Sequence, residues 1–402
     1  MDLSAYTTPN VWTRVLTDGT VETLRGTWNY WSMEDYQGSE TTTWLFDVKD
    51  LTGTILLTSG ASTDSTRIEA AFVGNVRNPP NAGQRILDEI GLSGIPTWNH
   101  ENACGSSSAA FRDGYAAVAS GLYDKVLVIG VEQMTRLGKG LLQFEDGSSL
   151  DLDMGLVTPA MFSLMGMRHM EEFGTKPEQF ARISVKNHKQ GTMNPYAQYQ
   201  NELTLEEVLN SKMICDPITL LQCTPIGDGA SAVVLTAGKI AKRYTSKPVE
   251  VKASVFTGGK YKGEGRAVGM ESCVRASREA YERSGLGPED LDVIELHDCF
   301  TVHELLAYED LGLCPKGEGG RLVDEGATAL GGRIPVNPSG GLLSKGHPLG
   351  ATGIGQLYEL VTQLRGEAGA RQVPGARHAI QENGGGMGGV EEAAVAVHIL
   401  SK

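Results

Sequence analysis

Short strand-like segments, most of them continuously apolar, recur along the chain from residue 67 onward. They cover residues 70–76, 125–131, 230–235, 292–296, 377–381 and 393–400. Runs without polar alternation are typical of interior strands in a parallel sheet. Segments with helical character lie between them, at residues 82–91, 109–122, 273–284, 301–312 and 354–364. This alternation predicts an α/β fold in which helices cover parallel sheets.

Two stretches interrupt this rhythm. Residues 1–66 hold four of the five tryptophans and show short alternating runs but little helical pattern. Residues 138–212 hold six of the twelve methionines, five of them between 154 and 170, and predict an insertion with its own helices. Methionines can line an adaptable acyl pocket, although helix core is their commoner use. We therefore divide the chain into an atypical N-terminal segment (1–66), a first half with the insertion (67–245) and a second half (246–402).

Composition and charge narrow the range of functions. Forty per cent hydrophobic and 21% charged residues describe a globular protein, and 35 basic against 49 acidic residues give a net charge of −14. This charge argues against nucleic acid or an anionic membrane as the main partner. No apolar run is long enough to span a membrane, and the N-terminus lacks the pattern of a signal peptide. The six cysteines stand singly, which predicts neither a zinc site nor a disulfide framework and fits a reducing cytoplasm.

The 51 glycines are unusually many, and clusters such as 340–341 and 384–386 lie between strongly patterned segments. We interpret these clusters as tight loops where a ligand or another backbone segment comes close. Each half of the chain then offers one reactive side chain on a small-residue turn that leads into a helix. An internal duplication is therefore plausible.

Cys104 is the reactive side chain of the first half. It follows an extended run (95–98), and Gly105 with three serines leads from it into a helix. A helix N-terminus carries about half a positive charge, which favours thiolate, the form that attacks carbonyls. A buried structural cysteine is the alternative interpretation.

The second half supplies groups that would complete such chemistry. His297-Asp298-Cys299-Phe300 follows a predicted strand, and His347 lies in the loop 337–353. Cleaving a carbon–carbon bond beside a thioester needs a nucleophile, its base, a second acid/base and N–H donors for oxyanions. Cys104, His347 and Cys299 would fill the first three roles in that order, with His297 as a donor toward a thioester or enolate oxygen. The loop 384–389 would supply free N–H groups. Taken singly, each residue also has a structural explanation.

Three motifs together resemble the thiolase family. The run 346–353, Gly-His-Pro-Leu-Gly-Ala-Thr-Gly, is similar to the thiolase GHP loop, and Asn-Ala-Cys-Gly-Ser at 102–106 is similar to the loop of its acylated cysteine. The HDCF run at 297–300 resembles thiolases of the sterol-carrier-protein-x type, in place of the Asn-Glu-Ala-Phe of most thiolases. The resemblance extends from about Thr66 to the C-terminus.

This resemblance implies two similar halves in a five-layered α-β-α-β-α arrangement, a homodimer or homotetramer, and CoA entering between the halves. It implies that Cys104 is acylated, His347 activates it, His297 polarises the thioester oxygen and Cys299 shuttles protons. Gly386 would give an oxyanion N–H. CoA is expected as cosubstrate, with no bound cofactor and no metal; Ser344, Gly346 and Asn383 are the candidate substrate and CoA contacts.

The chain also departs from the family pattern. The loop at 382–386 has no cysteine, so Cys299 would have to do that residue's work, and Glu382 stands where these relatives often have His. The opening strand of thiolases, expected at the centre of the first sheet, is not recognisable in residues 1–66, and we expect this segment to be poorly packed.

The leading functional prediction is a thiolase of lipid metabolism that acts on 3-oxoacyl-CoA. One alternative is a thiolase-like lyase that performs retro-aldol cleavage beside a small zinc-ribbon/OB-fold partner; relatives of that kind tend to lack the nucleophilic cysteine. The other is a non-catalytic subunit, in which Cys104, His297 or His347 would be replaced. A partner protein is possible for the thiolase as well.

Overall fold

The computed structural model describes residues 68–137, 155–260, 268–388 and 391–402, together with four short strands near the N-terminus. These strands are β1 (Trp12–Val15), β2 (Val21–Leu24), β3 (Trp28–Tyr30) and β4 (Glu40–Thr42), which pair β1 with β2 and β3 with β4. The rest of residues 1–66 lies outside the described part, and so does the prediction that this segment packs poorly.

The first half contains a four-stranded sheet in the order β10-β7-β5-β6. Its strands are β5 (Ala70–Gly74), β6 (Thr97–His100), β7 (Lys125–Gln133) and β10 (Asp228–Thr236). β5 runs parallel to β6 and β7, whereas β10 is antiparallel to β7. Every residue of β5 and β7 is buried, which accounts for their continuous apolar pattern.

The second half contains a sheet of the order β11-β14-β13-β12. Its strands are β11 (Glu250–Gly258), β12 (Val293–Glu295), β13 (His378–Gly388) and β14 (Glu391–Ser401). Only the β12–β13 pair is parallel, so the sheets are mixed rather than parallel throughout. The opening strand of this half, β11, lies at the sheet edge. The opening strand that we expected at the centre of the first sheet belongs to residues 1–66, most of which lie outside the described part of the chain.

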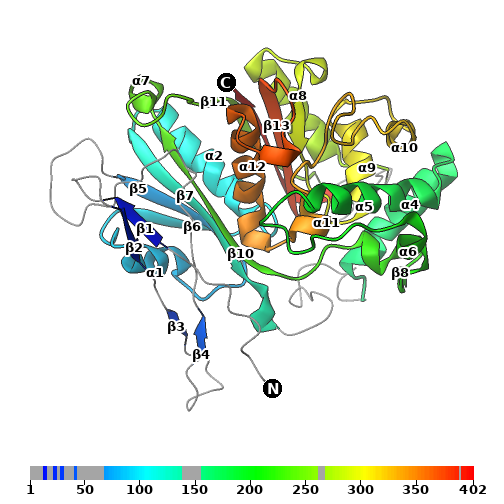
Figure 1. Ribbon diagram of the computed structural model, residues 1–402, viewed down its shortest axis with the longest axis horizontal. Helices are drawn as coiled ribbons and strands as arrows, with labels where there is room; N and C mark the ends of the chain where they lie inside the picture. The colour runs from blue at the N-terminus through cyan, green and yellow to red at the C-terminus, as the bar shows by residue number, and fades with distance from the viewer. Residues whose placement is uncertain are drawn as a thin grey trace.

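Helices form three layers around the two sheets, so the predicted five-layered arrangement is confirmed (Figure 1). The central layer is α2 (Ser106–Ala119) and α12 (Thr352–Arg365), which contact each other and strands of both sheets. α1 (Ala82–Glu89) covers the outer face of the first sheet and α8 (Glu271–Ser284) that of the second.

Successive side chains of β7 point to opposite faces of the first sheet and pack against two different helix layers. Val126 and Val128 pack with Phe111 and Leu357 in a core cluster that also includes residues of the second sheet. Leu127 and Ile129 point the other way and pack with α1. One core therefore joins the two halves across the central helices.

The segment that follows β7 carries helices of its own. These are η2 (Met134–Leu137), α4 (Thr158–Phe173), α5 (Pro177–Gly191) and α6 (Leu205–Asn210), followed by β8 (Met213–Cys215), β9 (Ile218–Thr219) and η3 (Leu220–Gln222). Met161 and Met165 are buried, and Met165 belongs to the core cluster of the second half, which favours the helix-core interpretation. That residues 138–212 form an insertion stays a prediction.

The first of the remaining elements, α7 (Gly238–Ala241), lies between β10 and β11, and the others lie between the strands of the second half. These others are η4 (Pro288–Asp290), α9 (Thr301–Asp310), α10 (Gly319–Asp324), α11 (Gly341–Lys345), η5 (Leu349–Ala351) and η6 (Gly369–Arg371). α5 contacts α9, α10 and α11. Among the described residues, no helix is both long and apolar enough to cross a membrane.

The glycine run near the C-terminus is not the predicted loop. β13 continues to Gly388, and Gly384 and Gly385 pair with Val395 and Ala394 of β14. Glycine is required because a Cβ on Gly384 would overlap the carboxyl group of Glu392, and one on Gly385 would overlap the carbonyl oxygen of Asn102. The run therefore brings β13 against the turn that carries Cys104.

Candidate active site

Cys104 sits on a tightly held turn between β6 and α2. Ala103, directly before it, has a φ of 47°, which costs an L-residue on the order of 1–3 kcal/mol. Ser106 offsets this strain: its hydroxyl donates to the Ala103 carbonyl at 2.6 Å and accepts from the Asn102 N–H at 2.8 Å. The turn thus presents the Cys104 sulfur in one orientation beside the start of α2.

His347 comes from the loop between α11 and η5, and two contacts fix it. Its Nδ1 lies 2.7 Å from the hydroxyl oxygen of Thr352, which itself donates to the Pro348 carbonyl at 3.0 Å. A hydroxyl has only one hydrogen to donate, and that of Thr352 is used in the bond to Pro348. It must therefore accept from His347, so Nδ1 carries the ring proton. Further along the loop, the Gly350 N–H donates to Glu132 of β7 at 3.1 Å, which ties the loop to the first sheet.

The structure brings Cys104 and His347 together. His347 Nε2 lies 3.2 Å from Cys104 Sγ although 243 residues separate them. Because Nδ1 is protonated, Nε2 has a free lone pair and can accept the thiol proton. The pair has the geometry of a nucleophile and its base.

The resting charge of this pair differs from the sequence-based expectation. Cys104 keeps some exposure, yet burial, followed by the charge of Glu392, raises its pKa to about 12, while the backbone N–H groups of Cys104 and Gly386 act in the opposite direction. Burial likewise holds the pKa of His347 well below its usual value. A dry site disfavours both charges, so thiol and imidazole are neutral at rest and the proton moves as the sulfur attacks.

His297 faces the same pair. Its ring centroid lies 5.1 Å from that of His347, and its backbone N–H donates to Glu382 at 3.0 Å. Neither ring nitrogen has a hydrogen-bond partner among the described residues. Burial lowers its pKa to about 3, so the ring is neutral and has one N–H to offer an oxygen atom.

Cys299 completes the group. Ligand-type atoms of Cys104, His297 and His347 lie within 4.8 Å of one another, and those of His297, Cys299 and His303 do as well. All four residues predicted to carry chemistry therefore converge, with His297 common to both groups. Burial raises the pKa of the Cys299 thiol well above its usual value, and nearby Cys104 and Glu392 add to this.

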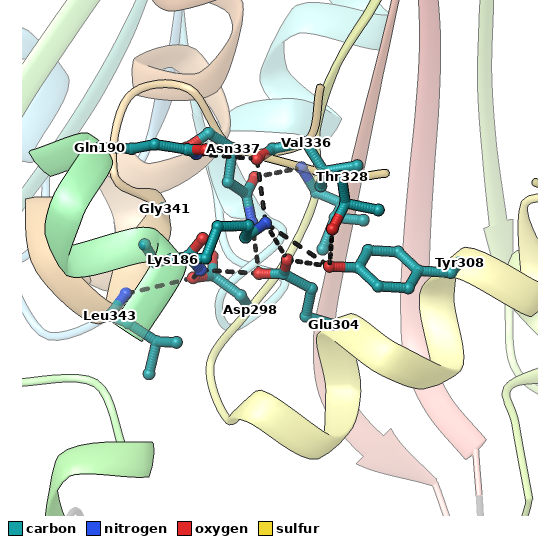
Figure 2. A network of polar contacts seen from close by, with 12 residues as sticks. Lys186, Gln190, Asp298, Glu304, Tyr308, Thr328, Val336, Asn337, Gly341 and Leu343 are labelled. Atoms are coloured by element: carbon teal, nitrogen blue, oxygen red, sulfur yellow. Dashed lines mark hydrogen bonds and ion pairs between the residues drawn. The ribbon is translucent and has the colours of Figure 1, made fainter. Parts of the chain in front are cut away.

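A buried polar network around Asp298 of the HDCF turn joins α5, α9 and α11 (Figure 2). Asp298 accepts hydrogen bonds from the backbone N–H groups of Leu342 and Leu343, at 2.7 and 3.3 Å, and from the Asn187 side chain at 2.8 Å. These bonds hold the start of α11, whose end leads directly into His347. Asn187 also donates to Glu304 at 2.7 Å, so α5 and α9 belong to the same network.

The substrate and CoA contacts predicted from the sequence stay predictions, and two of these side chains are hydrogen-bonded within the protein. Ser344 is fully buried, and its hydroxyl donates to the Tyr199 carbonyl at 2.7 Å. Asn383 is also fully buried; it accepts from the Ser108 hydroxyl at 2.8 Å and thereby links β13 to α2. The polar groups of both side chains therefore have hydrogen-bond partners within the protein. Gly346, with a φ of 103°, turns the chain toward His347.

Sequence reasoning missed three residues at the site. Glu132 accepts from two backbone N–H groups of residues 76–77 besides that of Gly350, which ties two loops to β7. His303 lies beside Cys299, and its i+4 spacing from that cysteine was a readable signal. Glu392 was signalled only by an acidic pair in an otherwise apolar strand. Ligand-type atoms of His303, Glu382 and Glu392 lie within 4.8 Å of one another, so this cluster could hold a metal ion.

Family models match most of the chain. Residues 31–239 match "Thiolase, N-terminal domain" and residues 261–402 match "Thiolase C-terminal domain-like". The first match begins at residue 31, before the start of the motif resemblance at about Thr66.

Similar sequences extend over four-fifths of the chain. The chain is 43% identical to an acetyl-CoA acetyltransferase of Methanothermobacter thermautotrophicus over 85% of its own length and 91% of that protein. It is 46% identical to sterol carrier protein 2 of Oryctolagus cuniculus over 80% of its length, but spans only 62% of that protein. It is 39% identical to the benzoylsuccinyl-CoA thiolase subunit BbsB of Thauera aromatica, over 77% of this chain and 81% of that one.

Solved structures share the fold. An Ltp2–ChsH2(DUF35) aldolase superposes with a TM-score of 0.71 at 23% identity, covering 82% of this chain and 86% of that one. The dimeric peroxisomal thiolase of Saccharomyces cerevisiae gives 0.62 at 18% identity, with 83% and 84% covered.

Proposed function

The chain belongs to the thiolase family, and on that premise we propose that it is an acyl-CoA C-acyltransferase. It would cleave 3-oxoacyl-CoA with CoA, or run the reverse Claisen condensation, through an acyl–Cys104 intermediate. The observation that carries this proposal is the 3.2 Å contact between Cys104 Sγ and His347 Nε2.

The first half-reaction acylates Cys104. His347 Nε2 takes the thiol proton while the sulfur attacks the 3-oxo carbon, and backbone N–H groups such as that of Gly386 stabilise the oxyanion. Collapse breaks the bond between carbons 2 and 3 and releases the acetyl-CoA enolate. His297, neutral and with an N–H to offer, would hold the enolate oxygen, and the Cys299 thiol would give its proton to carbon 2.

The second half-reaction transfers the acyl group to CoA. The Cys299 thiolate left by the first step takes the proton of the CoA thiol, and the CoA sulfur attacks the acyl–Cys104 thioester. Cys104 leaves as a thiolate, and His347 returns its proton. Both sulfurs and the imidazole end as they began, so the cycle needs no bound cofactor.

CoA and acyl-CoA are the partners that this chemistry requires. We also propose a homodimer or homotetramer in the cytoplasm, acting in lipid metabolism. A small zinc-ribbon/OB-fold partner is compatible with this proposal, since one relative carries the word subunit in its name. We propose the chain division at residues 66 and 245 as well.

The close approach of Cys104, His297 and His347 favours thiolysis over retro-aldol cleavage, which needs no acyl-cysteine. It also argues against a non-catalytic subunit, in which we would expect Cys104, His297 or His347 to be replaced.

One experiment tests the proposal. A panel of 3-oxoacyl-CoA esters, straight, branched and aromatic, is incubated with enzyme and free CoA, and the two product thioesters are quantified. Intact-protein mass spectrometry follows the acyl adduct in parallel. We expect both signals in the wild type and neither in Cys104→Ala. Cleavage that persists in Cys104→Ala would reject the acyl-cysteine route and favour the lyase.

A further inference from the structure

A second cysteine–histidine pair lies next to the first. Cys299 directly precedes the residue before α9, and His303 lies in the first turn of that helix, four positions later. His303 Nδ1 is 3.6 Å from Cys299 Sγ, within hydrogen-bonding range for sulfur. Both side chains are almost completely buried, and Phe162 of α4 packs against the His303 ring at a centroid distance of 5.2 Å.

A carboxyl group stands on the other side of this imidazole. Glu392 Oε1 lies 3.5 Å from His303 Nε2, and also 3.5 Å from His297 Nδ1. Glu392 is 2% exposed, and its Oε2 has no hydrogen-bond partner among the described residues. Sulfur, imidazole and carboxyl group thus stand in a row, as in nucleophile–base–carboxylate arrangements of hydrolases.

We propose that His303 and Glu392 are positioning residues for Cys299, holding its sulfur through His303 Nδ1 and stabilising the thiolate that forms when Cys299 gives up its proton. Glu392 fixes the opposite ring nitrogen and thereby the tautomer of His303. This inference rests on the proposed function, in which Cys299 shuttles protons, and it adds two residues to that role.

We call Cys299, His303 and Glu392 the relay, and its protons balance as follows. When the S–H bond of Cys299 breaks and a C–H bond forms on the enolate, His303 keeps its proton on Nδ1 and donates it to the sulfur as a hydrogen bond. Glu392, as a neutral acid, donates its O–H to Nε2. No proton enters or leaves the relay, and the CoA thiol later restores the S–H bond. The thiolate is therefore the only charge that Cys299, His303 and Glu392 gain together, and a dry site tolerates one charge better than several.

The charge state of the neighbourhood agrees with this arrangement. Burial raises the pKa of Glu392 to about 8, so its carboxyl group is protonated at neutral pH, and burial lowers the pKa of His303 well below its usual value. Other groups that face the pair are Cys104, His297, Asp298 and Glu382. Burial also raises the pKa of Glu382 well above its usual value.

The test measures the reactivity of Cys299 without substrate. The pH dependence of its modification by methyl methanethiosulfonate is followed by peptide mass spectrometry, with buried Cys273 and Cys314 as internal references. We expect His303→Leu, which fills the space but has no donor, to slow the reaction at least tenfold at pH 7.5 and to raise its apparent pKa by at least one unit. His303→Asn, whose amide nitrogen can replace Nδ1, should restore most of the rate. Glu392→Leu should give a modification rate and an apparent pKa between those of the wild type and His303→Leu.

Matched controls separate the relay from simple packing. His169→Leu removes another buried histidine, which contacts Glu309 of the same helix, and should leave the Cys299 profile unchanged. An unchanged profile in His303→Leu would overturn the proposal. A stoichiometric metal ion in the purified protein that His303→Leu loses would overturn it as well, because His303 and Glu392 would then be ligands.

Enzymatic readouts distinguish this proposal from the proposed function. In His303→Leu we expect the burst of acyl adduct on Cys104, which forms before Cys299 gives up its proton, to stay within about twofold of the wild type. The kcat for thiolysis should be at least tenfold lower, with KM for CoA unchanged. If no acyl-CoA acylates Cys104 in the wild type, the proposed function fails while the modification assay still reports on the relay. Equal losses in acylation and thiolysis would reject the specific link to Cys299.

Discussion

Thr352→Val tests whether the tautomer of His347 sets the rate of acylation. The Thr352 hydroxyl accepts from His347 Nδ1 at 2.7 Å and donates to the Pro348 carbonyl at 3.0 Å. Valine keeps the shape and removes the acceptor, which leaves a buried N–H unpaired at a cost of about 1–3 kcal/mol. If the ring instead moves its proton to Nε2, the atom that faces Cys104 can no longer accept the thiol proton.

Either outcome raises the barrier to acylation by a similar amount. At about 1.4 kcal/mol per factor of ten, we expect acylation of Cys104 to slow by about 5- to 150-fold. The assay is single-turnover acylation followed by rapid quench and intact-protein mass spectrometry. Thr362→Val is the matched control, since it removes a hydroxyl that donates to the Tyr358 carbonyl at 2.8 Å on the same helix. Thr352→Ser should retain most activity. A Thr352→Val rate within twofold of the wild type would refute the tautomer argument.

Three further predictions follow from close contacts and buried carboxyl groups. Gly385→Ala should abolish acylation and lower the free energy of unfolding in urea by at least about 2 kcal/mol, because its Cβ would overlap the Asn102 carbonyl. Gly238 has open space around it, so Gly238→Ala should have neither effect. Asp298→Asn should cost about 1–3 kcal/mol in the same assay and slow acylation, since an amide cannot satisfy all three donors; a variant as active and stable as the wild type would contradict this. Because burial raises the pKa of Glu392 from 4.5 to about 8, the folded state keeps a proton that the unfolded chain releases above pH 4.5, so its contribution to stability falls with rising pH up to about 8. From pH 5 to pH 8, the free energy of unfolding in urea should therefore fall less in Glu392→Gln than in the wild type. The difference should be at most about 1.4 kcal/mol per pH unit, and equal falls would refute the raised pKa.

The sequence predicted the elements that depend on local pattern. The continuous apolar run at 125–131 became β7, buried along its whole length, and the run at 82–91 became α1 with Gly91 in the left-handed region just after it. These predictions succeed because burial of a strand or one helix face imposes a period that side chains must follow.

The glycine run at 384–389 shows where local pattern fails. Clustered glycines normally indicate a loop, yet here β13 continues to Gly388 because β14 offers backbone partners to residues 384, 385, 387 and 388. The glycines are needed because the Cys104 turn and Glu392 approach β13 closely. The Cys104 turn is distant in sequence, so the residues next to the glycines give no sign of it. Glu392 was missed for the same reason: a glutamate in a strand gives no sign of what faces it across the sheet.

The reaction centre depends on how closely the two halves fit together. Cys104 belongs to the first half, whereas His347, His297 and Cys299 belong to the second, so the 3.2 Å contact exists only while the halves keep their mutual position. Direct bonds maintain it: Glu132 of β7 holds the Gly350 N–H, and Ser108 of α2 donates to Asn383 of β13. Both bonds are buried and lie within a few residues of the reacting groups. A change in either bond would therefore alter the distance between Cys104 and His347, and with it the rate, without any change in the reacting groups themselves.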